Sequence, residues 1–402
     1  MGPPKAFQLD QTGLPLHGLH LSFRYPPKKT VPLQLLLGKM KSFTTLMGYA
    51  SLLALVSAAP TPADQSLEVR QTTGENSSNN KNTVNTAAPI FPKKDAGDAP
   101  YSVSESALRS AIYIPPTFQY GKNGKQPILL VPGTSLPGGT TYSNAFGKLL
   151  AASSYADPVW INIPGYSLGD AQVNGEYVAY AMNYLSGVSG QKNISVITWS
   201  QGGPNAQWGL KYWPSTRSIV SDFIALAPDF KGTVEADLVC SGLTIPLCTP
   251  SIKQQRNKSN FIATIRNNGG DSAYVPTTTF YSATDEIVQP EIGTGASSIL
   301  LDARNVGVSN NQVQDLCPGT VQVVLHEGVL YNAVAWALIE DALKNDGPAQ
   351  RSRLNLLPLC KLPAAAGLNG IQGESILLNA VPNIIGYKNV GNSEPAIASY
   401  AK

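Results

Sequence analysis

A serine placed between a continuous apolar run and a pair of glycines is the feature that most constrains this chain. The run Ile194–Trp199 predicts a buried strand, and Ser200–Gly203, with the sequence SQGG, predicts a sharp turn into a helix starting at Gln201. A turn of this kind lifts a serine hydroxyl clear of its own backbone when small residues flank it. The pattern favours an α/β protein with Ser200 as a candidate nucleophile. The alternative is an ordinary turn, since Thr198 stands where the usual Gly-x-Ser-x-Gly motif has its first glycine.

The chain offers very few bases for such a serine. An alcohol is a weak nucleophile at neutral pH and needs a neighbouring base to take its proton. Of the three histidines, His17 and His20 lie in an N-terminal stretch that we expect to be dispensable. His326 is therefore the expected base; the alternative is a histidine that merely satisfies its hydrogen bonds at the end of a strand.

The N-terminal residues differ in composition from the rest of the chain. Residues 40–59 combine Lys41, the uncharged run Leu46–Val56 and the small residues before Pro60, which is typical of a secretory signal peptide. The alternatives are an N-terminal membrane anchor or a buried helix, although the apolar run is too short to span a bilayer comfortably. We expect residues 1–39 to be a dispensable or non-native extension, translation to start at Met40, and residues 60–95 to be a disordered pro-segment or linker. The expected location is extracellular, without a stable membrane span.

Charge excludes one class of partner. The formal net charge of +3 arises before residue 60, where six basic residues face one acid, whereas the chain from Pro60 onward carries 23 basic against 25 acidic residues. Such a surface offers nothing to a phosphate backbone, so we expect no nucleic-acid partner. Three asparagines, Asn76, Asn193 and Asn257, each begin an Asn-x-Ser/Thr triplet and are candidate glycosylation sites.

Four cysteines allow three disulfide pairings. Disulfides are expected in an exported protein, and proximity along the chain favours Cys240–Cys248 and Cys317–Cys360. The chain-entropy model assigns these closures about 2.5 and about 4 kcal/mol of stabilisation, the longer loop gaining more. The alternative is four free buried thiols.

From residue 96 to residue 402, apolar runs alternate with helical stretches. We expect strands at residues 127–131, 159–163, 194–199, 223–227, 277–283 and 321–325, and helices at residues 171–186, from 201, and 330–344. Continuous apolar strands alternating with helices indicate a mainly parallel sheet with helices on both faces, within one α/β domain.

Two further candidate residues follow expected strands. Asp285 comes just after residues 277–283, and His326 comes directly after residues 321–325. Active groups of open α/β sheets gather at the carboxyl ends of strands, and the chain order Ser, Asp, His is that of α/β-hydrolases. The alternative for Asp285 is a helix cap, with Glu286 as the substitute acid.

The loop after the first expected strand supplies candidate oxyanion donors. In Val131–Ser135, with the sequence VPGTS, Thr134 offers both an amide and a hydroxyl, and the backbone N–H of Gln201 offers a second donor. An ordinary glycine turn is the alternative. One histidine in the domain makes no credible zinc site and no phosphate-binding loop occurs, so we expect no metal and no cofactor.

Four segments together resemble one family. Pro127–Thr134, Thr198–Gly203, Ala227–Thr233 and Tyr281–Pro290 are similar to segments of the secreted fungal lipases of the Candida antarctica lipase B type, within a resemblance over about residues 125–390. The resemblance implies an α/β-hydrolase fold with a lid or cap region. It also implies cofactor-free hydrolysis of triacylglycerols and other carboxylic esters, with substrate met at a lipid–water interface.

The resemblance also implies a role for each site residue. Ser200 would be the nucleophile, Asp285 the orienting acid and His326 the base, with Thr134 and Gln201 as oxyanion donors. The implied substrate-binding residues are Trp199, Asp229, Gln255, Ile287 and Val288.

The chain departs from the family in its disulfides. Of the family's three, only Cys317–Cys360 is shared, and Cys240–Cys248 falls in the segment expected to form the lid. We therefore expect a monomeric, secreted triacylglycerol lipase acting through an acyl-enzyme on Ser200. The alternatives are a short-chain carboxylesterase or acyltransferase, and a catalytically silent binding protein of the same fold.

Overall fold

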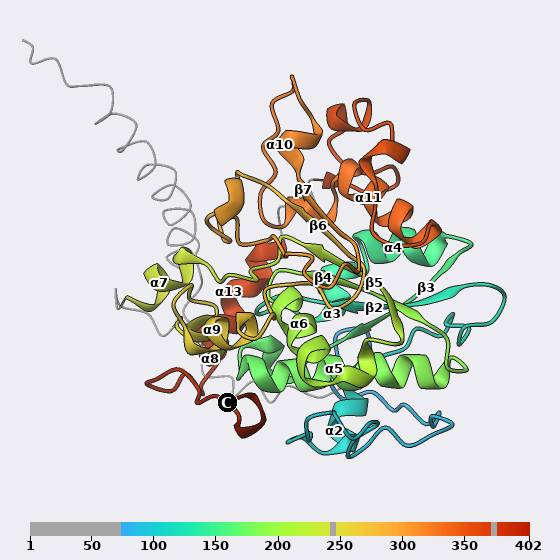
Figure 1. Ribbon diagram of the computed structural model, residues 1–402, viewed down its shortest axis with the longest axis vertical. Coiled ribbons are helices and arrows are strands. Elements are labelled where there is room, and N and C mark those ends of the chain that lie inside the picture. The colour runs from blue at the N-terminus through green and yellow to red at the C-terminus, as the bar shows by residue number, and fades with distance from the viewer. Residues whose placement is uncertain (1–73, 242–246, 371–375) are drawn as a thin grey trace, which may run out of the picture. The chain divides into compact units, whose positions relative to one another are not determined.

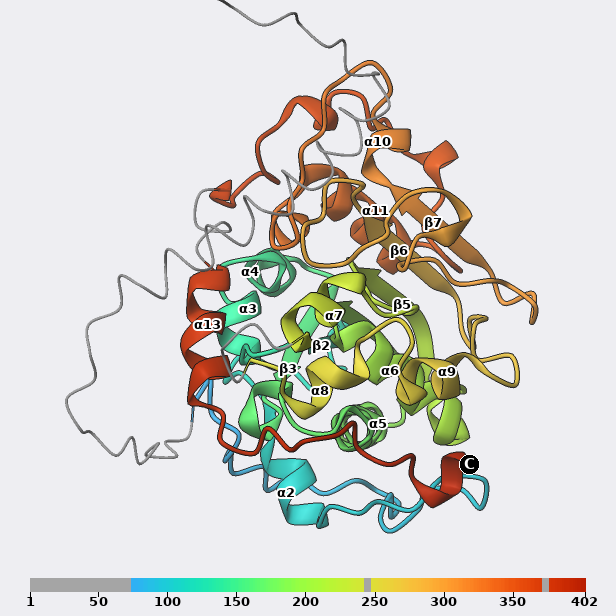
Figure 2. The same ribbon diagram turned by 90° about the vertical axis from the view of Figure 1, so that its left-hand side faces the viewer.

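One seven-stranded sheet forms the centre of this computed structural model, which describes residues 74–241, 247–370 and 376–402 (Figures 1 and 2). The strand order is β1-β3-β2-β4-β5-β6-β7. Only β1 runs antiparallel, against β3, and all other neighbours are parallel. The strands are β1 (Ile112–Tyr113), β2 (Gln126–Val131), β3 (Ala156–Ile161), β4 (Ile194–Trp199), β5 (Val220–Leu226), β6 (Thr277–Tyr281) and β7 (Val308–Gln312).

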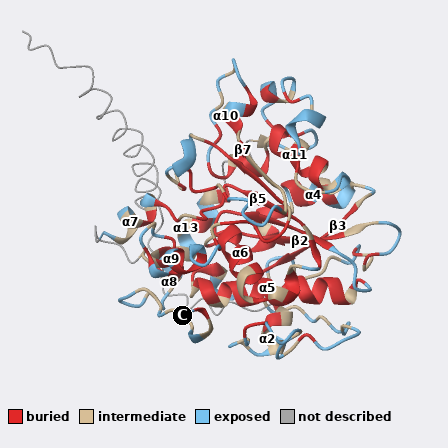
Figure 3. Ribbon diagram, viewed as in Figure 1, coloured by how far each residue is buried: buried red, intermediate tan, exposed pale blue. Residues whose placement is uncertain are grey.

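Helices cover both faces of the sheet, as the alternation of residues in β2 requires. Ile128 and Leu130 pack into one apolar cluster with α4 and α11, whereas Leu129 and Val131 pack into another with α5 and α6. Figure 3 shows α5 buried along most of its length. The helices are α2 (Glu105–Ser110), α3 (Gly138–Tyr142), α4 (Phe146–Ala152), α5 (Ala171–Val188), α6 (Gly202–Tyr212), α7 (Val234–Cys240), α8 (Pro250–Gln254), α9 (Asn260–Arg266), α10 (Val313–Leu316), α11 (Ala333–Lys344) and α13 (Ile376–Gly386). The predicted mainly parallel α/β fold is confirmed, and no described helix has the length and apolarity needed to cross a membrane.

One predicted strand is wrong. Residues 321–325 form no strand, and the side chain of Val321 is 91% exposed. The place beside β6 belongs instead to β7, whose sequence, VSNNQ, gives no apolar signal. A strand forms there because its polar side chains find partners: Asn310 accepts a hydrogen bond from Thr279 and donates one to the carbonyl of Leu300.

The described part of the N-terminal segment, residues 74–95, contains no helix or strand but lies against the α/β domain. Asn82 Nδ2 donates to the carbonyl of Ile112 at 2.7 Å, Tyr184 Oη donates to the carbonyl of Val84 at 2.6 Å, and Ile90 is buried. The expectation of disorder therefore fails for these residues, because domain side chains satisfy their backbone carbonyls. The expected N-terminal extension and signal peptide lie outside the described residues.

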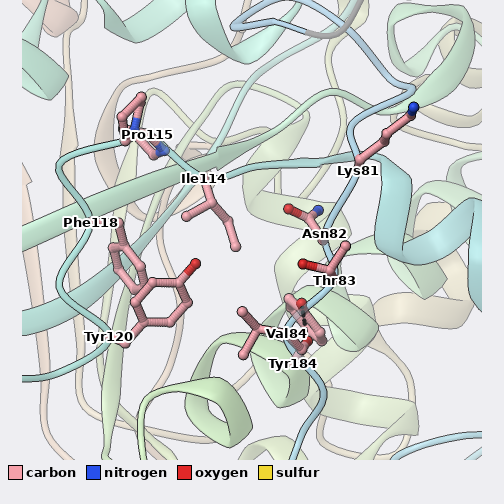
Figure 4. Close-up of a pocket in the computed structure, with 10 residues that line it drawn as sticks. Lys81, Asn82, Thr83, Val84, Ile114, Pro115, Phe118, Tyr120 and Tyr184 are labelled. Carbon is pink, nitrogen blue, oxygen red and sulfur yellow. Dashed lines mark hydrogen bonds between the residues drawn. The ribbon is translucent and has the colours of Figure 1, made fainter.

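This segment also forms one wall of a cavity of about 190 Å³. Figure 4 shows residues 81–84 on one side and Pro115, Phe118 and Tyr120 on the other. Val84 and Tyr120 also line an adjoining groove that reaches Lys192, just before β4 begins. The cavity therefore lies by the amino ends of the strands, away from the edge that carries Ser200.

Both predicted disulfides are confirmed. Cys240–Cys248 joins the end of α7 to the residues before α8, and Cys317–Cys360 joins the end of α10 to a later turn. The Cα–Cα separations are 4.9 and 5.7 Å. Part of the expected lid, residues 242–246, lies outside the described residues.

Candidate active site

Ser200 lies in a tight turn between β4 and α6. Its φ of +56° is in the left-handed region, which residues other than glycine rarely adopt. Its backbone N–H donates to the carbonyl of Leu226 at 2.9 Å. A Cβ on Gly202 would lie only 2.5 Å from the carbonyl oxygen of Val131, so the turn requires a glycine there. Ser200 lies at the carboxyl edge of the sheet and is 5% exposed.

His326 and Asp285 form a buried pair. Imidazole Nδ1 lies 2.8 Å from Asp285 Oδ2, and because a carboxylate only accepts, Nδ1 carries the proton and donates it. The other carboxylate oxygen, Oδ1, accepts from the backbone N–H groups of Ile287 and Val288 at 2.9 and 2.7 Å. These bonds fix the carboxylate and leave imidazole Nε2 available to a second partner.

Trp199 places this histidine next to the serine turn. Its Nε1 donates to the carbonyl of His326 at 3.0 Å, and its ring centre lies 5.0 Å from that of the imidazole. Trp199 directly precedes Ser200, so the imidazole packs on the residue beside the serine. Within the described residues, no hydrogen bond joins Ser200 Oγ to His326.

Two glutamates flank the same histidine. Glu286 Oε2 accepts from the backbone N–H of His326 at 3.0 Å, so Glu286 supports the histidine backbone while Asp285 contacts the ring. Glu327 is not among the predicted site residues, because its only signal in the sequence is its position directly after His326. Glu327 is 4% exposed, and its Oε2 has no hydrogen-bond partner among the described residues. Burial and the charge of Glu286 raise the pKa of Glu327 to about 7.

These acids set the proton affinity of the histidine. Burial alone would lower the pKa of His326, but the charge of Asp285, its hydrogen bond, and the charges of Glu286 and Glu327 outweigh burial. The result is a pKa of about 9.

The loop after β2 lies against the serine. A Cβ on Gly133 would be 3.3 Å from Ser200 Oγ. The Thr134 hydroxyl lies within donating distance of two amide oxygens, Oε1 of Gln201 at 3.0 Å and Oε1 of Gln255 at 3.1 Å. The backbone N–H groups of Thr134 and Gln201 take part in none of the loop and turn hydrogen bonds of the described residues. Three of the predicted site residues, two of them expected oxyanion donors, therefore meet beside Ser200.

Asp229 is a buried acid in the same region. Its side chain has no exposed surface, and neither carboxylate oxygen has a hydrogen-bond partner in another described residue. Burial raises its pKa to about 7, with the charges of His326 and Asp285 acting in opposite directions. Val288 is buried, and Ile287 is half-buried on the segment that holds Asp285.

The titration of His326 tests this electrostatic account. We expect its ring resonances to titrate near pH 9, and Glu327→Gln to lower that midpoint because it removes a charge that stabilises the imidazolium. Because the folded-state pKa lies above the ordinary value of about 6.5, this histidine stabilises the fold fully below pH 6.5 and loses that contribution as the pH rises through 9. NMR titration of the wild type and Glu327→Gln measures both midpoints, with the distant Glu340→Gln as control. A wild-type midpoint at or below 6.5 would contradict the account.

Comparison with known proteins finds similar lipases, although no protein-family model matches the chain. The chain is 35% identical to lipase B of Pseudozyma antarctica over 325 residues. This match covers 79% of this chain and 90% of that protein. The crystal structure of Aspergillus fumigatus lipase B is 52% identical, with a TM-score of 0.76, and the match covers 81% of this chain and 78% of that chain. The resemblance drawn from the sequence is confirmed, and the chain belongs to the lipase B family of α/β-hydrolases.

Proposed function

We propose that this chain hydrolyses carboxylic esters through an acyl-enzyme on Ser200. The observation that carries the proposal is the buried His326–Asp285 pair, held by Trp199 beside a serine in a left-handed turn. Membership of the lipase B family supports the same reaction class.

His326 acts as the base and then as the acid. Nε2 takes the proton of Ser200 as Oγ attacks the ester carbonyl carbon, while Asp285 holds Nδ1 and stabilises the imidazolium. The imidazolium then protonates the leaving alcohol, and the acyl group remains on Oγ. A water molecule repeats the sequence in the second half, losing its proton to Nε2, and the carboxylic acid leaves as Oγ regains its proton.

Thr134 and Gln201 stabilise the oxyanion. Their two backbone N–H groups are the fixed donors, and the Thr134 hydroxyl supplies a third when it turns from the glutamine oxygens toward the substrate. Trp199, Asp229, Gln255, Ile287 and Val288 form the surroundings of the bound ester, with the apolar side chains contacting its acyl and alcohol groups.

The substrate class is triacylglycerol, presented at a lipid–water interface. Both similar proteins are named lipase B, which supports this choice over a short-chain carboxylesterase or an acyltransferase. A catalytically silent binding protein of this fold would not need the His326–Asp285 pair and the oxyanion loop together.

The protein is secreted and acts as a monomer. Two disulfides support an oxidising compartment. Residues 1–39 are an N-terminal extension and residues 40–59 a signal peptide. The catalytic domain includes residues 74–95, because they pack on it. Asn76 and Asn193 are exposed and are the preferred glycosylation sites, whereas Asn257 Oδ1 is buried.

Replacing the nucleophile tests the acyl-enzyme. Ser200→Ala should lower the turnover of p-nitrophenyl butyrate by about 10⁵- to 10⁶-fold with the melting temperature unchanged, because no other group then attacks the carbonyl. A fluorophosphonate should label the wild type at Ser200 and leave the variant unlabelled. Retained activity, or labelling at another residue, would refute the assignment.

The Thr134 hydroxyl has its own test. Thr134→Val removes this donor and should lower kcat about 100- to 1000-fold, since the donor acts mainly in the transition state. Thr134→Ser keeps the hydroxyl and is the matched control, expected to stay close to the wild type. A loss of less than threefold in the valine variant would remove the hydroxyl from the mechanism.

The choice of triacylglycerol can be checked with tributyrin. A lipase should gain rate when tributyrin exceeds its solubility limit and forms droplets, because the enzyme then works at an interface. Saturation below that limit, with no gain above it, would favour a short-chain esterase. Product analysis with added butanol measures the acyl-transfer share in the same assay.

A further inference from the structure

The first described residues contact the carboxyl end of β3. The carbonyl oxygen of Glu75 accepts from Trp160 Nε1 at 2.6 Å and from Asn162 Nδ2 at 3.0 Å, and the carbonyl oxygen of Ser77 accepts from the same Nδ2 at 2.9 Å. Asn162 directly follows β3 and is 2% exposed. The segment therefore supplies acceptors to buried donors that would be costly to leave unpaired.

Helix α3 begins at contacts with Asn162 and with Asn76, which lies between Glu75 and Ser77. The N–H of Gly138 donates to Asn162 Oδ1, and the N–H of Thr140 donates to Asn76 Oδ1, both at 2.7 Å. The first N–H groups of a helix have no partner within it, and the residue before α3, Pro137, offers no side-chain cap. A Cβ on Gly139 would lie 2.5 Å from Asn76 Oδ1, so glycine permits the segment to approach this closely.

Helix α3 in turn fixes the loop that carries Thr134. Only Ser135, Leu136 and Pro137 separate Thr134 from the helix. At the other end of α3, Tyr142 Oη donates to the carbonyl of Val131, the last residue of β2, at 2.7 Å. The loop therefore runs between two anchored points. Between them, Ser135 donates its N–H to the carbonyl of Tyr166 and accepts from Asn383 Nδ2, both at 2.7 Å. The position of the second anchor, α3, depends on Asn162 and Asn76.

We propose that residues 75–77 form a positioning element for the oxyanion loop, in which Asn76 is the positioning residue that holds α3 in place. This inference rests on the proposed function, because the position of Thr134 matters only when an oxyanion forms. The oxyanion develops in the transition state and is absent from the bound ester. A loosened loop should therefore lower kcat and leave KM nearly unchanged.

Asn76 also begins a glycosylation triplet, Asn76-Ser77-Ser78. A glycan attaches to Nδ2, whereas the contact with Thr140 uses Oδ1, so both can exist on one side chain. The test must separate the two roles. Asn76→Ala removes both, Asn76→Asp keeps an acceptor oxygen without the glycan, and Ser78→Ala removes the triplet while leaving Asn76 in place.

The experiment measures kcat, KM and the melting temperature of the full chain on p-nitrophenyl butyrate. Asn76→Ala should lower kcat about fivefold, roughly the effect of one hydrogen bond, with KM within twofold of the wild type. Asn76→Asp and Ser78→Ala should both stay within twofold of the wild type. In Gly139→Ala, the added Cβ would clash with Asn76 Oδ1 and displace residues 75–77 from α3. This variant should lower kcat by a factor similar to that of Asn76→Ala.

Several results would overturn the inference. An Asn76→Ala enzyme with wild-type kcat, even with a lower melting temperature, would leave Asn76 a merely structural role. Equal losses in Asn76→Ala and Ser78→Ala would assign the effect to the glycan. A wild type that neither turns over esters nor reacts with a fluorophosphonate would instead refute the proposed function. With such an inactive protein, the anchoring of α3 by Asn76 is measured by amide exchange in residues 138–142. This exchange must be faster in Asn76→Ala than in Ser78→Ala.

Discussion

The hydrogen bond between His326 Nδ1 and Asp285 Oδ2 is the interaction on which the candidate site depends. It is buried on both sides, so little water competes for either partner. It fixes the protonated nitrogen, and Nε2 is therefore the nitrogen left to act on Ser200. The surrounding acids raise the pKa of the imidazole to about 9, which makes it a stronger base for the serine proton, but the neutral ring that accepts this proton predominates only above that pH.

The sheet brings these residues together across long distances in the chain. Ser200 follows β4 and Asp285 follows β6, and these strands are parallel with β5 between them, so both residues lie at the same edge. His326 belongs to no strand and reaches this edge through Trp199, Glu286 and Asp285. Its position is held by side-chain contacts, whereas that of Ser200 is held by the backbone of the turn.

Elements positioned by local backbone structure could be predicted from the sequence, whereas elements positioned by side-chain contacts could not. Strand β4 and helix α5 carry apolar patterns strong enough to be located within a few residues, and the turn at Ser200 follows from them. The polar strand β7 and the absence of a strand at residues 321–325 could not be predicted, because the strand beside β6 is selected by contacts with residues far away in the sequence. Glu327 was missed for the same reason, since burial beside Glu286 gives it a role that an isolated glutamate does not reveal.

The contacts of Glu75 and Ser77 have a practical consequence for recombinant work. Cutting the chain at residue 96, where the apolar alternation begins, would strip the partners from Trp160 Nε1 and Asn162 Nδ2. An affinity tag or a fusion partner is thus better joined ahead of Gly74 than at the domain start that hydrophobicity alone suggests. The exposed surface near Asn193 is a suitable place to attach the enzyme to a solid support, since that loop precedes β4 at the edge of the sheet remote from Ser200.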